Sequence, residues 1–356
     1  MNIKYPFPRE EYKVLVRCFT YNQSKYIEDA LNGFAMQQTT FPFVCLVMDD
    51  ASTDGEQQVI KAWMERECDM NKAETVDSPT SVITIVPHKT NISCTFAYYF
   101  LNQNLYREEE KKMKHVYPWQ ERCQYEALCE GDDYWIDPLK LQKQVDFMDA
   151  NPKCVLCHTG FKIFEDSKNE FIDCSEIIRR NTKLYDNNKQ IMGDILDETR
   201  YRVQTVTTLI RLSIYPKVRD ILCPYEGKFL MGDTQMWLAL LSLGDICFMP
   251  EITSVYRVNI GSACNSSLMK YRVRFDLSCA EMRVCMADLF DLDEKLKKRL
   301  QNQYQKKLNL YFPYEPNYKV FIPIKFNNVL ELTRYHFLRL PVVRSVLRDY
   351  YIRKSM

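Results

Sequence analysis

Short apolar runs and helix-patterned segments alternate through the first half of the chain, and no other feature constrains the fold as much. The apolar runs have the length of buried strands, and the segments between several of them carry apolar residues at helical spacing. The runs cover residues 14–16, 43–48, 82–86, 125–129 and 155–164. Strand, helix and strand in this order are typical of a mostly parallel sheet with right-handed crossovers. We therefore predict an α/β protein with a Rossmann-like sheet flanked by helices.

Two helix starts can be predicted from cap residues. Ser24 precedes a segment with apolar residues at helical spacing, and a serine oxygen often accepts the first free N–H groups of a helix. Thr53 and Glu56 have the spacing of a capping box, in which each side chain bonds the backbone N–H of the other. We predict that Ser24 and Thr53 begin helices and that Glu56 completes the second cap.

The composition is that of a globular protein without a strong charge bias. Hydrophobic residues make up 46% of the chain and charged residues 27%, which is enough for a large buried core. The formal net charge of +1 gives no overall basic field, so nucleic acid is not an expected partner. The 14 cysteines stand singly in apolar stretches, as in reducing compartments. With no signal peptide or membrane span evident, we expect a cytoplasmic protein.

The scarcity of glycine excludes the common ways in which such sheets bind phosphate. Only nine glycines occur, and the sequence contains neither a G-x-G-x-x-G turn nor a Walker A loop. The remaining common solution is a divalent cation, held by carboxylates and shared with phosphate oxygens. Acidic residues at the ends of the predicted strands could provide these carboxylates.

Polar residues follow directly on three of the predicted strands. They are Thr20-Tyr21-Asn22, Asp49-Asp50 and Glu130-Gly131-Asp132-Asp133. Because ligands of such sheets bind beyond the carboxyl ends of the strands, we expect these residues to line a site. Three acids within four residues repel one another unless a cation or solvent screens them. Residues 130–133 thus indicate either an Mn²⁺ or Mg²⁺ site or a solvated acidic turn, and Asp49-Asp50 alone fits an ordinary helix-entry loop.

A further acidic residue, Asp233, precedes an apolar helical segment that ends before Gly244. The simple interpretation is a helix N-cap, and the functional one is a general base for an acceptor hydroxyl. Both roles are compatible, because the helix dipole keeps a carboxylate at this position ionised.

Taken in order, these segments resemble the motifs of family-2 glycosyltransferases. Residues 14–37 are similar to the opening strand, T-Y-N turn and first helix of that family, and residues 47–54 to its D-D-x-S-T-D segment. Residues 130–135 resemble its D-x-D-D metal motif, and residues 232–238 its base motif. Residues 256–262 resemble the tyrosine–arginine segment that closes the domain.

The resemblance implies a GT-A fold that binds a nucleoside-diphosphate sugar, with uridine as the base. The donor would be contacted by Thr20, Tyr21, Asp50, Asp132, Trp135 and Arg257. Asp132, Asp133 or both would hold Mn²⁺ or Mg²⁺ on the diphosphate, and Asp233 would deprotonate the acceptor hydroxyl. The sugar would be transferred with inversion, in the synthesis of a surface polysaccharide or another glycan. The alternative is a non-catalytic GT-A-like module that scaffolds a glycan-assembly complex.

The resemblance ends near residue 265, so we predict a GT-A domain over residues 1–265 and a mainly helical extension over residues 266–356. Residues 289–308 have a helical pattern, and residues 325–354 mix apolar with basic side chains. We favour a helical subdomain that packs on the rest of the protein. The other hypothesis is a basic interfacial segment that contacts the inner face of the cell membrane, where a lipid-linked acceptor would lie.

Overall fold

The computed structural model describes residues 12–106, 109–197, 202–259 and 268–315, together with residues 318, 319, 322, 333, 336, 337, 340 and 343. The chain forms two compact units. Unit 1 comprises residues 1–183, 202–220 and 243–257, and unit 2 comprises residues 184–201, 221–242 and 258–356. The predicted domain boundary at residue 265 lies outside the described residues and stays a prediction.

The described residues contain a sheet of eleven strands, most of it in unit 1. The strands are β1 (Val14–Thr20), β2 (Phe43–Asp49), β3 (Glu74–Asp77), β4 (Ser81–Pro87), β5 (Cys94–Leu101), β6 (Tyr125–Leu128), β7 (Tyr134–Trp135), β8 (Cys154–Glu165), β9 (Glu170–Ile172), β10 (Leu209–Arg211) and β11 (Asp245–Val258). Their order is β3-β4-β5-β2-β1-β6-β10-β8-β11-β7, and β9 pairs with β8. The predicted α/β class is confirmed. The parallel part consists of the central strands β5, β2, β1 and β6, and the antiparallel pairs lie on either side of it.

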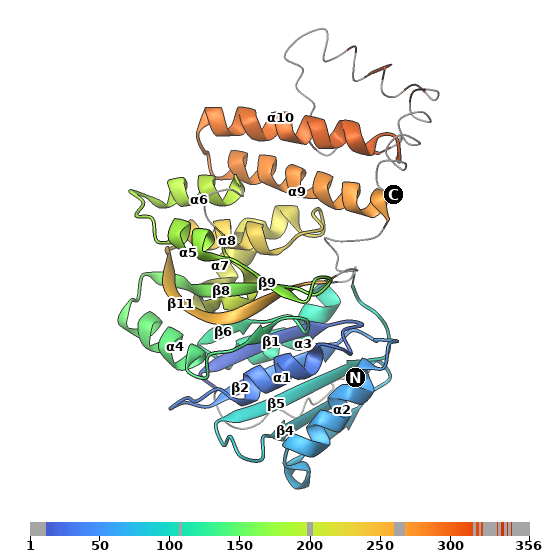
Figure 1. Ribbon diagram of the computed structural model, residues 1–356, viewed down its shortest axis with the longest axis vertical. Helices are drawn as coiled ribbons and strands as arrows, with labels where there is room; N and C mark the ends of the chain where they lie inside the picture. Colours follow the sequence, from blue (N-terminus) through green and yellow to red (C-terminus); the bar gives the residue numbers. More distant parts are fainter. Residues whose placement is uncertain are drawn as a thin grey trace. The chain divides into compact units, whose positions relative to one another are not determined.

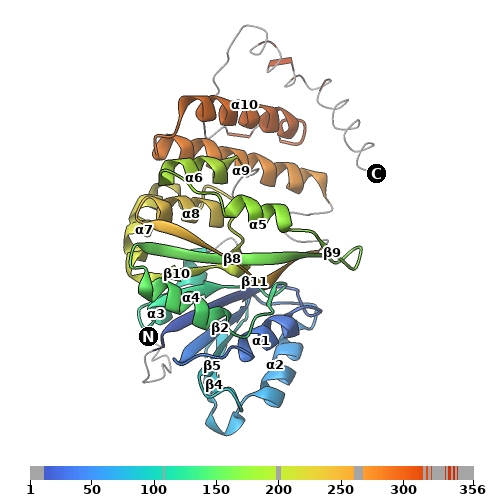
Figure 2. The same ribbon diagram turned by 60° about the vertical axis from the view of Figure 1, so that its left-hand side comes forward.

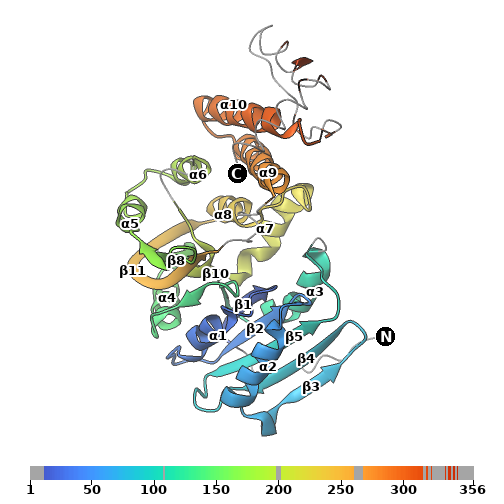
Figure 3. The ribbon, with the colours of Figure 1, turned by 45° about the vertical axis from the view of Figure 1, so that its right-hand side comes forward.

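Helices cover both faces of the central strands. This is required because successive side chains of β1 point to opposite faces and those on both faces are buried. The helices of unit 1 that form these layers are α1 (Ile27–Ala35), α2 (Glu56–Glu67), α3 (Glu109–Gln120) and α4 (Lys140–Ala150). Val14, Val16 and Cys18 point to the face covered by α1, α2 and α4, whereas Leu15 belongs to the core beneath α3. Figure 3 shows α1 and α2 on one side of the strands and α3 on the other. The chain also forms α5 (Ser175–Asn181) and α7 (Tyr215–Leu222).

Both predicted helix caps are wrong, for a common reason. Helix α1 begins at Ile27 after Tyr26, and the Ser24 backbone N–H instead donates to Asp54 Oδ2 at 2.9 Å. Helix α2 begins at Glu56, after Gly55 in the left-handed conformation with φ of 91°. The two turns that precede these helices bond to each other through the Ser24 and Thr53 N–H groups, and each helix begins after the predicted cap.

Unit 2 is helical where it is described. It contains α6 (Asn188–Leu196), α8 (Asp233–Leu241), α9 (Met269–Leu289) and α10 (Glu294–Tyr311). Helices α9 and α10 lie side by side (Figures 1 and 2), which confirms the predicted helical character of the extension. The helix predicted over residues 289–308 is, however, interrupted after Leu289, and Asp293 caps α10 by accepting the N–H groups of Lys295 and Leu296. Most of the basic segment over residues 325–354 lies outside the described residues.

Among the described residues, no helix is both long enough and apolar enough to cross a membrane.

Candidate functional site

The three polar segments meet at the carboxyl ends of adjacent parallel strands. Strands β2 and β6 flank β1, with Thr20 in register with Asp49 and Arg17 in register with Leu128. Beyond the strand ends, the Asp50 N–H donates to the Thr20 carbonyl at 3.0 Å, and the Gly131 N–H donates to the Phe19 carbonyl at 3.2 Å. The turn after β1 therefore lies between the two acidic segments, as predicted.

Gly131 allows the acidic segment to approach the end of β1 closely. A Cβ atom at this position would lie 2.7 Å from Thr20 Cβ and 2.5 Å from Gln23 Oε1, which is closer than packed side chains tolerate. Burial raises the pKa of the Cys18 thiol, and Glu130, Glu56, Asp132 and Asp133 raise it further. Four carboxyl groups thus lie around this end of β1.

Glu56 joins the turns that follow β1 and β2. It is fully buried, and its carboxylate accepts the Thr20 hydroxyl, the Gln23 N–H at 2.9 Å and the Ser52 hydroxyl at 2.8 Å. Burial raises its pKa despite these donors. Its spacing from Thr53 predicts a capping box, and no local pattern indicates that it reaches a turn 36 residues earlier. The structure therefore adds Glu56 to the groups that shape the site.

We expect Glu56→Ala to lower the free energy of unfolding by about 2 kcal/mol, because three donors lose their buried acceptor. Glu56→Gln keeps an acceptor oxygen and should cost less. Urea unfolding of both variants measures the difference. Equal stability of Glu56→Ala and the wild type would show that the network does not hold the two turns together.

Asp49 and Asp50 differ in how their carboxylates are used. Asp50 Oδ1 accepts the Leu105 N–H at 2.6 Å, and Oδ2 lies 3.6 Å from Lys112 Nζ. Asp49 Oδ1 accepts the Gln57 side chain at 2.6 Å, whereas buried Asp49 Oδ2 has no hydrogen-bond partner within the described part of the chain. Asp50 is thus already paired, and Asp49, which is not among the predicted donor contacts, carries the unsatisfied acceptor.

Residues 130–133 form an acidic turn, in which Asp132 and Asp133 occupy different environments. Asp132 is half-buried, whereas Asp133 is buried and its Oδ1 accepts the Arg257 N–H at 2.8 Å. Burial raises the pKa of Asp133 well above its usual range, and the charge of Asp132 raises it further. Nowhere in the described ranges do three or more His, Cys, Asp or Glu side chains form a ready-made metal site. These two carboxylates could hold a cation together with oxygens of a ligand or of water.

Trp135 and Arg257 are both buried beside the acidic turn. The Trp135 indole donates to the Val206 carbonyl at 2.9 Å and packs edge-on against Phe34, so its ring is part of the core. The Arg257 guanidinium donates to the Asp132 carbonyl at 2.8 Å. The structure gives both side chains contacts within the protein, and their contact with a donor stays a prediction.

A fully buried lysine supports the strand that follows the acidic turn. Lys140 Nζ lies 4.5 Å from the centre of the Trp135 ring and donates to Gln144 Oε1 at 2.6 Å. Burial lowers the pKa of Lys140 to about 7. At a pH between about 7 and 10.5, the usual pKa of lysine, Lys140 is protonated in the unfolded chain but not in the folded chain. The free energy of unfolding should therefore rise with pH across this window, and the contribution of Lys140 should be lowest below pH 7.

We expect the free energy of unfolding of the wild type to rise by about 2 kcal/mol more than that of Lys140→Met between pH 7 and pH 9. Urea unfolding at both pH values measures this difference. Lys143→Met removes a neighbouring lysine whose side chain is 40% exposed, and it should keep the pH dependence of the wild type. Parallel pH profiles for Lys140→Met and the wild type would contradict the low pKa.

Tyr21 and Asp233 complete the predicted set. The Tyr21 side chain follows Thr20 and is exposed, which its ring would require to stack against the base of a donor. Asp233 is the first residue of α8 in unit 2, and its Oδ1 accepts the Thr234 N–H at 2.6 Å. Gly232, not Asp233, occupies the N-cap position. The role of Asp233 as a base stays a prediction.

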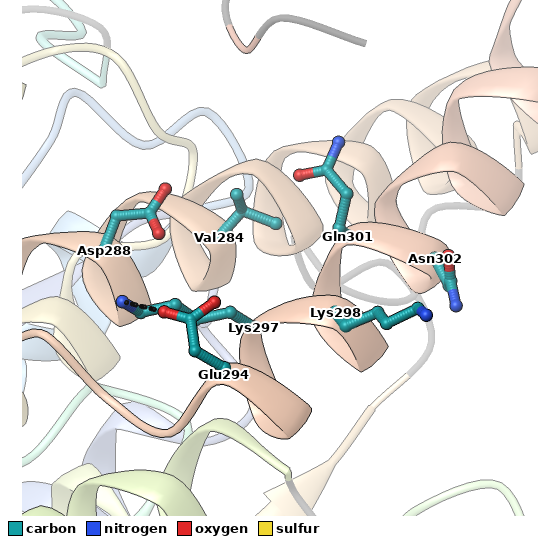
Figure 4. Close-up of a pocket in the computed structure, with 7 residues that line it drawn as sticks. All are labelled: Val284, Asp288, Glu294, Lys297, Lys298, Gln301 and Asn302. Carbon is teal, nitrogen blue, oxygen red and sulfur yellow. Dashed lines mark hydrogen bonds and ion pairs between the residues drawn. The ribbon is translucent and has the colours of Figure 1, made fainter. Parts of the chain in front are cut away.

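Unit 2 also contains an open polar pocket of about 300 Å³ between α9 and α10 (Figure 4). Lys297 donates to Glu294 at its rim, and the other lining residues are Val284, Asp288, Lys298, Gln301 and Asn302. None of the predicted site residues lines this pocket.

The chain matches no model of a known protein family. It is 35% identical over 274 residues to proteins of Mycobacterium bovis and Mycobacterium tuberculosis, named Uncharacterized protein Mb1547 and Uncharacterized protein Rv1520. The match covers 77% of this chain and 66% of each relative, so the chain spans slightly less than two thirds of their length.

Solved structures of other proteins are similar at low identity, among them the following two. One is S. aureus TarS 1–349 in complex with UDP, with a TM-score of 0.46 and 16% identity over 96% of this chain and 87% of that chain. The other is the mannosyltransferase PcManGT from Pyrobaculum calidifontis in complex with GDP-Man and Mn²⁺, with a TM-score of 0.48 and 11% identity over 98% of this chain and 88% of that chain. At these scores the similarity is too loose to assign an activity.

Proposed function

We propose that the protein is an inverting glycosyltransferase of the GT-A type, which transfers a sugar from a uridine-diphosphate sugar to a hydroxyl acceptor. The observation that supports this proposal most is the convergence of three turns at the carboxyl ends of β2, β1 and β6. These turns contain the segments whose sequences resemble the donor-binding motifs of family-2 glycosyltransferases. A glycan or a lipid-linked glycan would be the acceptor.

The nucleoside would lie over the turns that follow β1 and β2. Tyr21 offers an exposed ring for stacking, and Asp49 Oδ2 offers a buried acceptor without a partner among the described residues. Asp50 would contact the base only if it shared its carboxylate with Leu105 and Lys112. Hydrogen bonds from a ligand to a buried, unsatisfied acceptor are favourable, because that acceptor has already lost its water.

The residues of the acidic turn fit a divalent cation. Asp132 and Asp133 provide the hard oxygen donors that Mg²⁺ and Mn²⁺ prefer. Asp133 is buried beside a second carboxylate, so that nearby positive charge would favour its ionised form. Two protein carboxylates with phosphate oxygens are a usual coordination for such ions. When bound, the cation would neutralise the charge that develops on the departing diphosphate.

The remaining chemical step requires a base for the acceptor hydroxyl. Asp233 is our candidate, because it places a carboxylate in the first turn of α8, where the helix dipole stabilises negative charge. It would accept the hydroxyl proton as the acceptor oxygen bonds to the anomeric carbon from the side opposite the diphosphate. The bond to the diphosphate breaks in the same step, so that the configuration of the sugar is inverted.

Release of nucleoside diphosphate from a panel of uridine-, guanosine- and thymidine-diphosphate sugars, with Mn²⁺, tests the proposal. We expect slow hydrolysis of one donor without acceptor and faster release with a suitable glycan acceptor. NMR of the product then gives the anomeric configuration. A product that retains the donor configuration would contradict the inverting step. Binding of a nucleotide sugar without release under any condition would favour a non-catalytic binding module.

A further inference from the structure

Arg257 lies near the end of β11, next to the acidic turn of residues 130–133. Strand β11 pairs with β7 through Ser254 opposite Trp135 and Val255 opposite Tyr134. Arg257 lies two residues beyond the last of these pairs, and its backbone N–H donates to Asp133 Oδ1 at 2.8 Å. The sheet register therefore places this residue directly against the turn that carries Asp132 and Asp133.

The guanidinium holds the same turn by a second contact. Its Nη1 donates to the Asp132 carbonyl oxygen at 2.8 Å, and its Nη2 donates to Asp29 Oδ2 on α1 at 2.8 Å. The charged group also lies 4.6 Å from the centre of the Tyr26 ring and 5.0 Å from that of Tyr134. Arg257 thus connects the acidic turn to β11 and α1, and two aromatic rings lie beside its guanidinium.

These contacts argue against the direct donor contact that the sequence resemblance implies for Arg257. The side chain of Arg257 is only 7% exposed, and both terminal nitrogens already have partners, whereas its buried Nε has none among the described residues. To reach a phosphate, the guanidinium would have to leave Asp29, the Asp132 carbonyl and both rings. Separating a buried charge from its partners costs free energy, so these contacts favour a fixed position for the guanidinium.

We propose that Arg257 is a positioning residue, which holds Asp132 and Asp133 in the conformation that binds a divalent cation and does not itself contact the donor. This inference rests on the proposed function for the identity of the ligand. The contacts that Arg257 makes with the acidic turn do not depend on it.

Arg257→Lys tests the inference, because an ammonium group cannot make the two divergent contacts of the guanidinium. The matched control is Arg211→Lys. Arg211 is also partly buried and bonds the Cys154 and Met148 carbonyls, but it is in register with Tyr125 at the opposite end of β6. Thermal unfolding first establishes that both variants are folded.

Calorimetric titration with UDP, in Mn²⁺ and in chelator, gives the first readout. We expect Arg257→Lys to weaken Mn²⁺-supported binding about tenfold, or about 1.4 kcal/mol, and to change metal-free binding less than about twofold. Arg211→Lys should change neither. Unchanged Mn²⁺-supported binding in Arg257→Lys would overturn the inference. So would an equal loss with and without the metal, which would indicate direct contact with the nucleotide.

Amide hydrogen exchange gives a readout that needs no ligand. We expect the amides of Gly131 and Asp133 to exchange about tenfold faster in Arg257→Lys and at the wild-type rate in Arg211→Lys. If the wild type binds no nucleotide, the proposed function fails, but the exchange rates still decide the positioning role. Wild-type exchange rates in Arg257→Lys, or the same acceleration in Arg211→Lys, would overturn it.

Discussion

Replacing both acidic-turn carboxylates, in Asp132→Asn/Asp133→Asn, is expected to weaken Mn²⁺-supported nucleotide binding by about 100-fold or more. Asparagine keeps the size of each side chain and a carbonyl oxygen, but it removes both negative charges. A divalent cation would then be held by the ligand alone. Calorimetric titration of the variant with UDP, in Mn²⁺ and in chelator, measures the loss.

Asp149→Asn is the control for this prediction. Asp149 pairs with Lys13 and accepts the Tyr125 hydroxyl at the opposite end of β6, so the same chemical change is made away from the acidic turn. It should leave nucleotide affinity at the wild-type value. If the Asp132→Asn/Asp133→Asn variant kept its Mn²⁺-supported affinity, the acidic turn would be a structural feature and not a cation site.

Removing the candidate base, in Asp233→Asn, is expected to lower the rate of sugar transfer about 1,000-fold while the affinity for the nucleotide stays the same. The amide cannot accept the proton of the acceptor hydroxyl, but it can still accept the Thr234 N–H as Asp233 does. Steady-state transfer rates with a working donor and acceptor, together with calorimetry, measure the two effects separately.

The matched control is Asp220→Asn, which makes the same change at an exposed position on α7. It should transfer sugar at the wild-type rate. Loss of nucleotide affinity in Asp233→Asn would indicate a role in donor binding. Wild-type turnover in Asp233→Asn would exclude Asp233 as the base and would leave the acceptor proton to another group.

The central strands β1, β2 and β6 could be predicted because they depend on local patterns. The apolar runs over residues 14–16, 43–48 and 125–129 became β1, β2 and β6, since buried parallel strands need little more than continuous apolar side chains. The polar residues that follow these runs lie close together because neighbouring parallel strands end at the same edge of the sheet. Thr20, Asp50 and Gly131 are therefore close in space, as expected from topology alone.

Contacts between distant turns could not be predicted in the same way. Glu56 resembles a cap residue in sequence, yet it accepts hydrogen bonds from a turn that follows another strand. Arg257 contacts residues 124 and 125 positions away, and Trp135 is buried by Val206 and Phe34. Such side-chain partners depend on how the loops pack after the sheet has formed, and no periodicity in the sequence encodes them.

The central claim is that the carboxyl edge of β2, β1 and β6 binds a nucleoside diphosphate with a divalent cation. Its most direct test is calorimetric titration of the wild type with UDP, GDP, dTDP and CDP, each with Mn²⁺ and with chelator. We expect one nucleotide, UDP, to bind with micromolar affinity in Mn²⁺ and at least about tenfold more weakly in chelator. Absence of binding for all four nucleotides under both conditions would contradict the claim.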